Sequence, residues 1–129
     1  MDRGNEYRHG FSSDAWEAAK DEACMVMRAR ARRGHPISYS DLVSEIESVS
    51  MDPHDPRLAH FLGQISRAEH EAGRGLLTAV VVHKHDGFPG DGFFELAESL
   101  GRSVADREGC WIIEMERLRD EAKAGSRLR

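Results

Sequence analysis

Cysteine is scarce in this sequence, with only Cys24 and Cys110 among 129 residues and no Cys-x-x-Cys pair. Disulfide frameworks and structural zinc sites need several cysteines at fixed spacing, so neither is expected to hold this fold together. Cys24 lies within a helical pattern, and Cys110 precedes an apolar run. We therefore expect two buried free thiols, which behave as small hydrophobic side chains.

A long hydrophobic segment is also missing. The longest apolar run, Leu76 to Val82, is interrupted by Thr78, whereas a helix that spans a bilayer needs about 20 apolar residues. The N-terminus has no basic region followed by an apolar stretch, so we expect no secretory signal. These absences predict a protein of the bacterial cytoplasm with no membrane partner.

Recognised catalytic motifs are missing as well. The sequence contains no Gly-x-Ser-x-Gly, no His-Glu-x-x-His and no phosphate-binding Gly-Lys-Ser/Thr, the patterns that place nucleophiles, zinc ligands and phosphate cradles. Paired carboxylates such as Glu45 and Glu47 lie in amphipathic helical patterns and read as solvated faces. We expect a binding module and not an enzyme, with no cofactor.

The chain has no excess of positive charge. Its formal net charge is −5 and its pI is about 5.8, whereas a dedicated nucleic-acid binder usually shows a basic excess. Only Lys20, Lys84 and Lys123 of its 18 basic residues are lysines. Arginine side chains are well suited to binding phosphates and carboxylates. A GC-rich genome would produce the same preference for arginine over lysine.

The composition that remains is that of one folded domain. A chain of 129 residues with 40% hydrophobic residues can bury a stable core without disulfide bonds or structural metal ions. Residues 1–12 are polar and contain glycine, and we expect them to be flexible. We expect a single globular domain over residues 13–124 and a frayed C-terminus over residues 125–129.

Hydrophobic periodicity predicts about five helices. The first starts near Ser13 and stops at Gly34, and the second, capped by Ser40, runs from Asp41 to about Val49. Asp55 as N-cap and Pro56 at the first helical position predict the start of the third, which ends before Gly73. Two more are expected around residues 93–100 and from about Asp106 to Ala124.

Two segments are expected to be extended. The run from Leu76 to His83 is apolar on both faces and rich in valine, as in a central strand. The short segment Ile37 to Tyr39 either pairs with it, or the longer strand pairs elsewhere, for example across a dimer. The predicted class is α+β, mostly helical, with a small sheet of two or three strands in the order of a winged helix-turn-helix.

The outer face of the third predicted helix carries Arg57, His60, Gln64 and Arg67, spaced three, four and three residues apart. These side chains can bond phosphates and base edges. A solvated helix face has the same appearance, and the acidic residues that follow the stripe would repel DNA. The stripe is the leading candidate for nucleic-acid binding.

Residues 36–92 resemble part of a known family. The segment Ile37-Ser38-Tyr39-Ser40-Asp41-Leu42, the helix with Leu62-Gly63, and the run from Thr78 to Gly87 are similar to the winged-helix DNA-binding part of O6-alkylguanine alkyltransferases and alkyltransferase-like proteins. The resemblance implies that Tyr39 corresponds to a tyrosine used in flipping a base. His60 stands where the family has an arginine. The acceptor cysteine is absent, because Val80 to Val82 occupy its region, so the resemblance implies no alkyl transfer.

The segment from His83 to Asp86 has two interpretations. His83 and His85 would point the same way from an extended chain, and with Asp86 they are candidates for a metal site. Alternatively, Lys84 and His85 belong to a wing that contacts backbone phosphates. Because no fixed metal-binding motif is present, we expect no metal.

The segment from Gly87 to Gly92 joins the predicted strand to a helix N-terminus. Backbone N–H groups at Gly87, Gly90, Asp91 and Gly92 are candidates for holding an anion, and a tight turn is the alternative. A further alternative is an apolar surface of the rings that lie here, Phe88, Phe93 and Phe94. Three functions follow: a nucleic-acid-associated module with DNA as partner, a protein-interaction subunit or homodimer that uses residues 87–94, and a small metal- or anion-binding enzyme domain.

Overall fold

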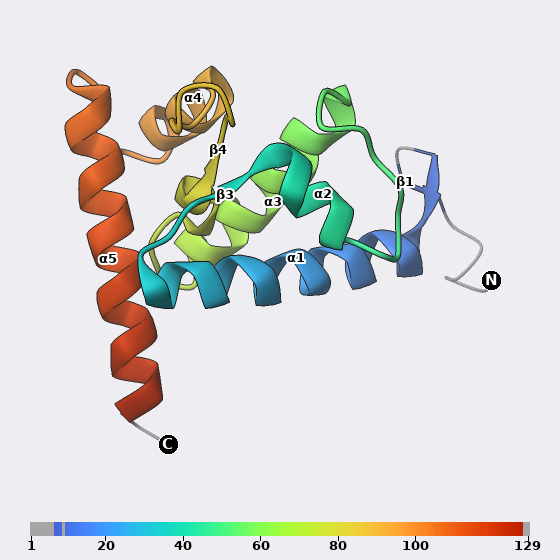
Figure 1. Ribbon diagram of the computed structural model, residues 1–129, viewed down its shortest axis with the longest axis horizontal. Helices are drawn as coiled ribbons and strands as arrows, with labels where there is room; N and C mark the ends of the chain where they lie inside the picture. Colours follow the sequence, from blue (N-terminus) through green and yellow to red (C-terminus); the bar gives the residue numbers. More distant parts are fainter. Residues whose placement is uncertain (1–6, 9, 128–129) are drawn as a thin grey trace.

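The computed structural model describes residues 7–8 and 10–127 (Figure 1). The helices are α1 (Ser13–Arg33), α2 (Tyr39–Glu45), α3 (Pro56–Glu71), the 3-10 helix η2 (Leu77–Val80), α4 (Asp91–Ser99) and α5 (Arg107–Arg127). The strands are β1 (Tyr7–Arg8), β2 (Phe11–Ser12), β3 (Ile37–Ser38) and β4 (Val81–Val82). The predicted α+β class, mostly helical with a small sheet, is confirmed.

The boundaries of α1 follow from its capping residues. The hydroxyl of Ser12 accepts a hydrogen bond from the Ala15 N–H at 3.1 Å, which satisfies one of the free donors at a helix start. Gly34 ends the helix with φ of 69°, a left-handed conformation that glycine adopts without steric cost. One face of α1 carries a buried apolar stripe, whose members are Trp16, Ala19, Ala23, Met27 and Ala31.

The predicted flexible N-terminus falls partly outside the described residues, which omit residues 1–6 and 9. Its described part is an antiparallel pair of short strands, in which β1 pairs with β2. Phe11 stacks on Trp16 with ring centroids 6.0 Å apart. This contact attaches the segment to α1.

The second helix differs from its prediction at both ends. Its N-cap is Ser38, whose hydroxyl accepts the Asp41 N–H at 3.1 Å, and not Ser40. The helix ends at Glu45, short of Val49, because the Glu22 carboxylate of α1 accepts the next backbone N–H groups, those of Glu47 and Ser48, at 3.0 Å each. The carboxylate therefore replaces the next helical turn as hydrogen-bond partner.

The expected pairing of the two extended segments is confirmed, but the longer one is mostly not a strand. β3 and β4 pair in parallel, with Ile37 opposite Val81. The preceding residues form η2, because tertiary partners satisfy their backbone: Trp111 Nε1 donates to the Ala79 carbonyl at 2.8 Å, and the Leu76 N–H donates to Glu114 at 3.0 Å. A short apolar run does not by itself distinguish a strand from a buried helical turn.

The wing of the predicted winged helix has no return strand within the described residues. After β4 the chain makes a tight turn, in which the His83 N–H donates to the Phe88 carbonyl at 2.9 Å, and it then enters α4. The order helix–strand–helix–helix–strand is present, followed by a turn and a helix.

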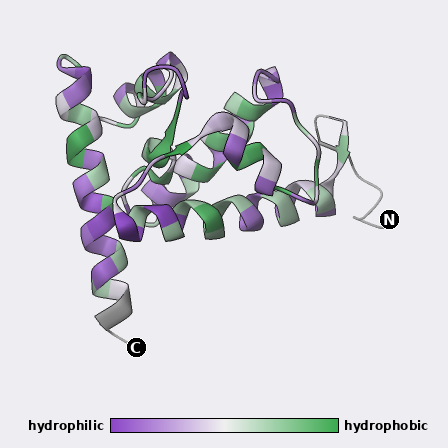
Figure 2. Cartoon of the chain, viewed as in Figure 1, coloured by the Kyte–Doolittle hydropathy of each residue, from purple (hydrophilic) through white to green (hydrophobic). Residues whose placement is uncertain are grey.

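The core lies among the helices, around η2 and β4 (Figure 1). In Figure 2 hydrophobic residues gather along η2 and β4, while the C-terminal half of α5 is hydrophilic. α5 crosses the C-terminal end of α1 and projects past it (Figure 1), reaching Arg127 where the sequence predicted fraying after Ala124. None of the described helices has the length and apolar character to cross a membrane.

Candidate nucleic-acid interface

A cleft of about 1260 Å³ lies between α3, the start of α2, the turn after β4 and the start of α4. It brings together most of the residues singled out from the sequence. Those that line it are Tyr39, His60, Gln64, Arg67, His83, Lys84, His85, Gly90, Asp91 and Gly92. Arg57, Asp86 and Gly87 do not line it.

Tyr39 forms part of the wall, at the point where β3 ends and α2 begins. Its hydroxyl oxygen accepts a hydrogen bond from the Gly90 N–H at 3.3 Å, and its ring lies 4.9 Å from the ring of His83. Burial raises the pKa of the hydroxyl, against the smaller opposing effect of the Gly90 N–H. Tyr39 is therefore held in place as a neutral ring.

The turn after β4 presents Lys84 and His85 to solvent. The turn is closed by the Gly87 N–H, which donates to the His83 carbonyl at 2.8 Å, and by Asp86, which accepts the Phe88 N–H at 2.9 Å. Gly87 has φ of 67°, which an L side chain rarely adopts. The turn is thus a compact projection beside the cleft.

The residues of the predicted stripe on α3 do not share one role, because some of their side chains are held by protein contacts and others are exposed. Gln64 accepts hydrogen bonds from Trp16 Nε1 at 2.8 Å and from Lys20 at 3.3 Å, and it also contacts His60 at 3.0 Å. Its amide therefore joins α3 to α1 and is not available to read a base edge.

Arg57 does not line the cleft. It pairs with Asp55 at 2.6 Å and lies 4.5 Å over the ring of Phe11. Arg67, in contrast, is exposed and lines the cleft. Among the residues that the structure describes, the side chains of Arg67 and Lys84 have no hydrogen-bond or ion-pair partner.

In the glycine segment before α4, the side chains of His83 and Tyr39 lie close to the backbone of Gly90. A Cβ at Gly90 would lie 2.9 Å from His83 Nε2 and 3.3 Å from the Tyr39 hydroxyl oxygen, so glycine is needed here. No side chain caps α4, and Asp91 pairs with Arg107 at 2.7 Å. The Asp91 charge, which from the sequence would oppose an anion, is therefore offset by a neighbour.

The apolar surface expected of Phe88, Phe93 and Phe94 is not present. Phe93 and Phe94 are buried, and the half-buried ring of Phe88 packs on Phe94 at 5.4 Å and on Trp111 at 5.3 Å. The sequence shows a run of aromatic residues, but it does not show that Phe88 packs on Trp111 of α5. These rings belong to the core.

The metal-site candidates His83, His85 and Asp86 do not form a ligand set. Over residues 7–8 and 10–127, no group of three or more histidine, cysteine, aspartate or glutamate side chains is arranged to hold a metal ion. The rings of His83 and His85 stack at 5.2 Å, but the segment is a turn and not the extended chain from which their common direction was predicted.

His54 and Glu95 also line the cleft, and of the two Glu95 was not identified from the sequence. His54 lies in the loop that leads to the Asp55 cap. Glu95 lies one turn after Asp91 on α4. Helical spacing would have placed it on the same face as Asp91.

Comparison with protein-family models, with curated proteins and with solved structures gives no significant match to this chain.

Proposed function

We propose that this chain is a non-catalytic domain that binds nucleic acid in the cleft between α3 and the turn after β4. The observation that carries the proposal is the pair of exposed cations, Arg67 from α3 and Lys84 from the turn, which line one cleft and have no partner within the described part of the chain. Cations without internal partners are available to phosphates, which supply most of the affinity of such complexes.

The net charge of the whole chain is negative, but the negative charges that line the cleft are largely balanced by neighbouring cations. Two of its carboxylates are paired, Asp55 with Arg57 and Asp91 with Arg107. Glu95 is the remaining carboxylate among the residues that line the cleft. Local charge clustering, and not the total, governs attraction of a polyanion.

Aromatic rings add a second kind of contact. Tyr39 and His83 line the same cleft as the two cations, their rings lie 4.9 Å apart, and bases stack on such rings. DNA is the partner we propose.

The thiols of Cys24 and Cys110 are free, which supports a reducing compartment such as the bacterial cytoplasm.

The test is binding of fluorescently labelled short DNA, single-stranded and double-stranded, measured by anisotropy at about 50 mM and about 200 mM salt. We expect binding that weakens with salt. The double variant Arg67→Ala/Lys84→Ala should bind weakly and should reduce the slope of log affinity against log salt by about 2, one for each lost phosphate contact.

The matched control is Arg32→Ala/Lys123→Ala, which removes the same charge from exposed positions on α1 and α5 that do not line the cleft. It should bind as the unmodified protein does. Equal weakening by the two double variants would show that only the total charge matters and would overturn the cleft as the site. Absence of binding at low salt would overturn the function.

A further inference from the structure

Three rings from two segments lie in series at the edge of the cleft, the first pair tilted and the second pair stacked. The ring of Tyr39 lies 4.9 Å from that of His83, tilted by 39°. The ring of His83 lies 5.2 Å from that of His85, at an interplanar angle of 30°. The series begins at the half-buried Tyr39 and ends at His85, whose side chain is 77% exposed.

Hydrogen bonds hold the hydroxyl of Tyr39 and the main chain of His83 in position. The Gly90 N–H donates to the Tyr39 hydroxyl, and the closed turn holds His83 through its own N–H and carbonyl. Gly90 also leaves the space that His83 Nε2 occupies. The ring series is therefore organised before any ligand arrives, which lowers the entropic cost of stacking on it.

The shape of α3 argues against a duplex. Reading a major groove requires a helix that projects from the protein, but the α3 residues His60 and Arg67 line a concave cleft. The two other members of the expected stripe, Arg57 and Gln64, are held by protein contacts. The cleft is also larger than a usual small-molecule pocket of roughly 300–1,000 Å³, and its volume suits a segment of chain.

We propose that the Tyr39–His83–His85 ring series is a base-stacking platform, and that the cleft takes single-stranded nucleic acid in preference to duplex. An unpaired base would extend the series on His85, while Lys84 and Arg67 contact the phosphates of the same strand. In a duplex the base faces are already stacked on one another, so only the phosphate contacts remain. This inference rests on the proposed function and names its ligand class.

The experiment compares three labelled ligands of equal length: a single strand of thymidines, the same strand in a duplex with adenosines, and a strand with abasic sites that keeps the phosphates. The unmodified protein should bind the thymidine strand at least tenfold more tightly than either other ligand. Loss of one stacked base corresponds to a loss of affinity of about tenfold.

The variants are His85→Ala, His85→Phe and Lys84→Ala. His85→Ala should bind the thymidine strand about tenfold more weakly and the abasic strand unchanged, while His85→Phe, which keeps a flat ring, should retain the affinity for thymidines. Lys84→Ala should weaken binding of all three ligands alike. His85 is exposed, so these variants should keep the fold, which circular dichroism checks.

Two results separate the inference from the function it rests on. Salt-sensitive binding with no preference for the single strand, or a His85→Ala variant that binds thymidines as tightly as the unmodified protein, overturns the stacking platform and leaves nucleic-acid binding intact. No binding of any ligand by the unmodified protein overturns both.

Discussion

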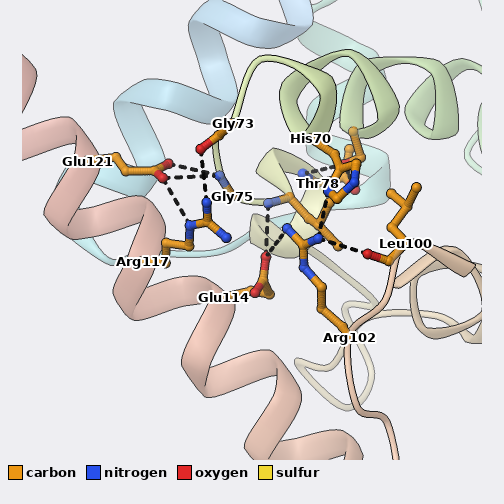
Figure 3. Close-up of polar contacts among 11 residues, drawn as sticks. His70, Gly73, Gly75, Thr78, Leu100, Arg102, Glu114, Arg117 and Glu121 are labelled. Atoms are coloured by element: carbon orange, nitrogen blue, oxygen red, sulfur yellow. Dashed lines mark hydrogen bonds and ion pairs between the residues drawn. The ribbon is translucent and has the colours of Figure 1, made fainter. Parts of the chain in front are cut away.

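Glu114 is a buried carboxylate on α5 whose removal tests how the core is held together (Figure 3). It accepts the N–H of the fully buried Leu76 at 3.0 Å, and it lies 3.6 Å from Nη2 of Arg102, which is itself largely buried. Arg102 also donates through Nη1 to His70 Nδ1 at 2.7 Å and to the Leu100 carbonyl at 3.1 Å. The carboxylate thus joins α5 to η2 and to the segment that links α4 with α5.

The substitution Glu114→Ala should cost about 3 kcal/mol of unfolding free energy. An unsatisfied buried donor such as the Leu76 N–H costs about 1–3 kcal/mol, and breaking a buried ion pair costs about 3–5 kcal/mol. The two effects are not additive, and Arg102 keeps its other hydrogen bonds, so we take the low end of the second range. A loss of this size would lower the thermal midpoint by about 10 °C.

The measurement is urea unfolding followed by far-UV circular dichroism and analysed by linear extrapolation. Glu114→Gln, which keeps an acceptor for the Leu76 N–H but removes the charge, should lose about half as much. The control is Glu116→Ala, an exposed glutamate two residues further along α5, with an expected change within about 0.5 kcal/mol. A loss below about 1 kcal/mol for Glu114→Ala would show that the Glu114 carboxylate does not hold α5 to η2.

Three further predictions concern acid stability, a buried hydroxyl pair and the charge of the cleft. Burial opposes ionisation of Glu69, but hydrogen bonds from Arg74 and Arg28 outweigh it and lower the pKa of that carboxyl. The ionised Glu69 therefore stabilises the folded state at pH values above the ordinary titration range of a glutamate. This contribution to the free energy of unfolding is lost as pH falls through the lower pKa of the folded state. Urea unfolding at a series of pH values should show this loss, and Glu69→Gln should reduce it. Ser66→Ala should cost about 1–3 kcal/mol, since it removes the acceptor of the buried Thr78 N–H at 3.2 Å; exposed Ser103→Ala serves as the control, and equal unfolding curves for the two would contradict the prediction. Glu95→Gln should tighten DNA binding in the anisotropy assay because it removes a negative charge from the cleft, and an unchanged or weaker affinity would count against phosphates lying there.

The sequence predicted the parts of the fold whose cause is local. Ser12 and Gly34 bound α1, and Asp55 with Pro56 starts α3, because caps depend on residues within a few positions of one another. The run before β4 was predicted as a strand and is mostly η2. Its backbone partners, among them Trp111 and Glu114, come from α5, and nothing in the local pattern of valines carries that information.

The candidate site was predictable as a set of residues but not as a shape. Side-chain chemistry singled out Arg67, Lys84 and His85, and the family resemblance pointed to Tyr39; the cleft contains all four. The same reasoning included Arg57, which instead pairs with Asp55. Whether a charged side chain faces a cleft or a neighbour depends on tertiary packing, which helical spacing alone does not specify.

An amide NMR titration with a short thymidine strand tests whether nucleic acid lies in the cleft. We expect the backbone signals of four residues that line it to shift together as the strand is added, namely Arg67, Lys84, Gly90 and Gly92. The signals of Arg32 and Lys123 should stay in place. Shifts confined to the exposed arginines of α1 and α5, with the cleft signals unmoved, would contradict binding in the cleft.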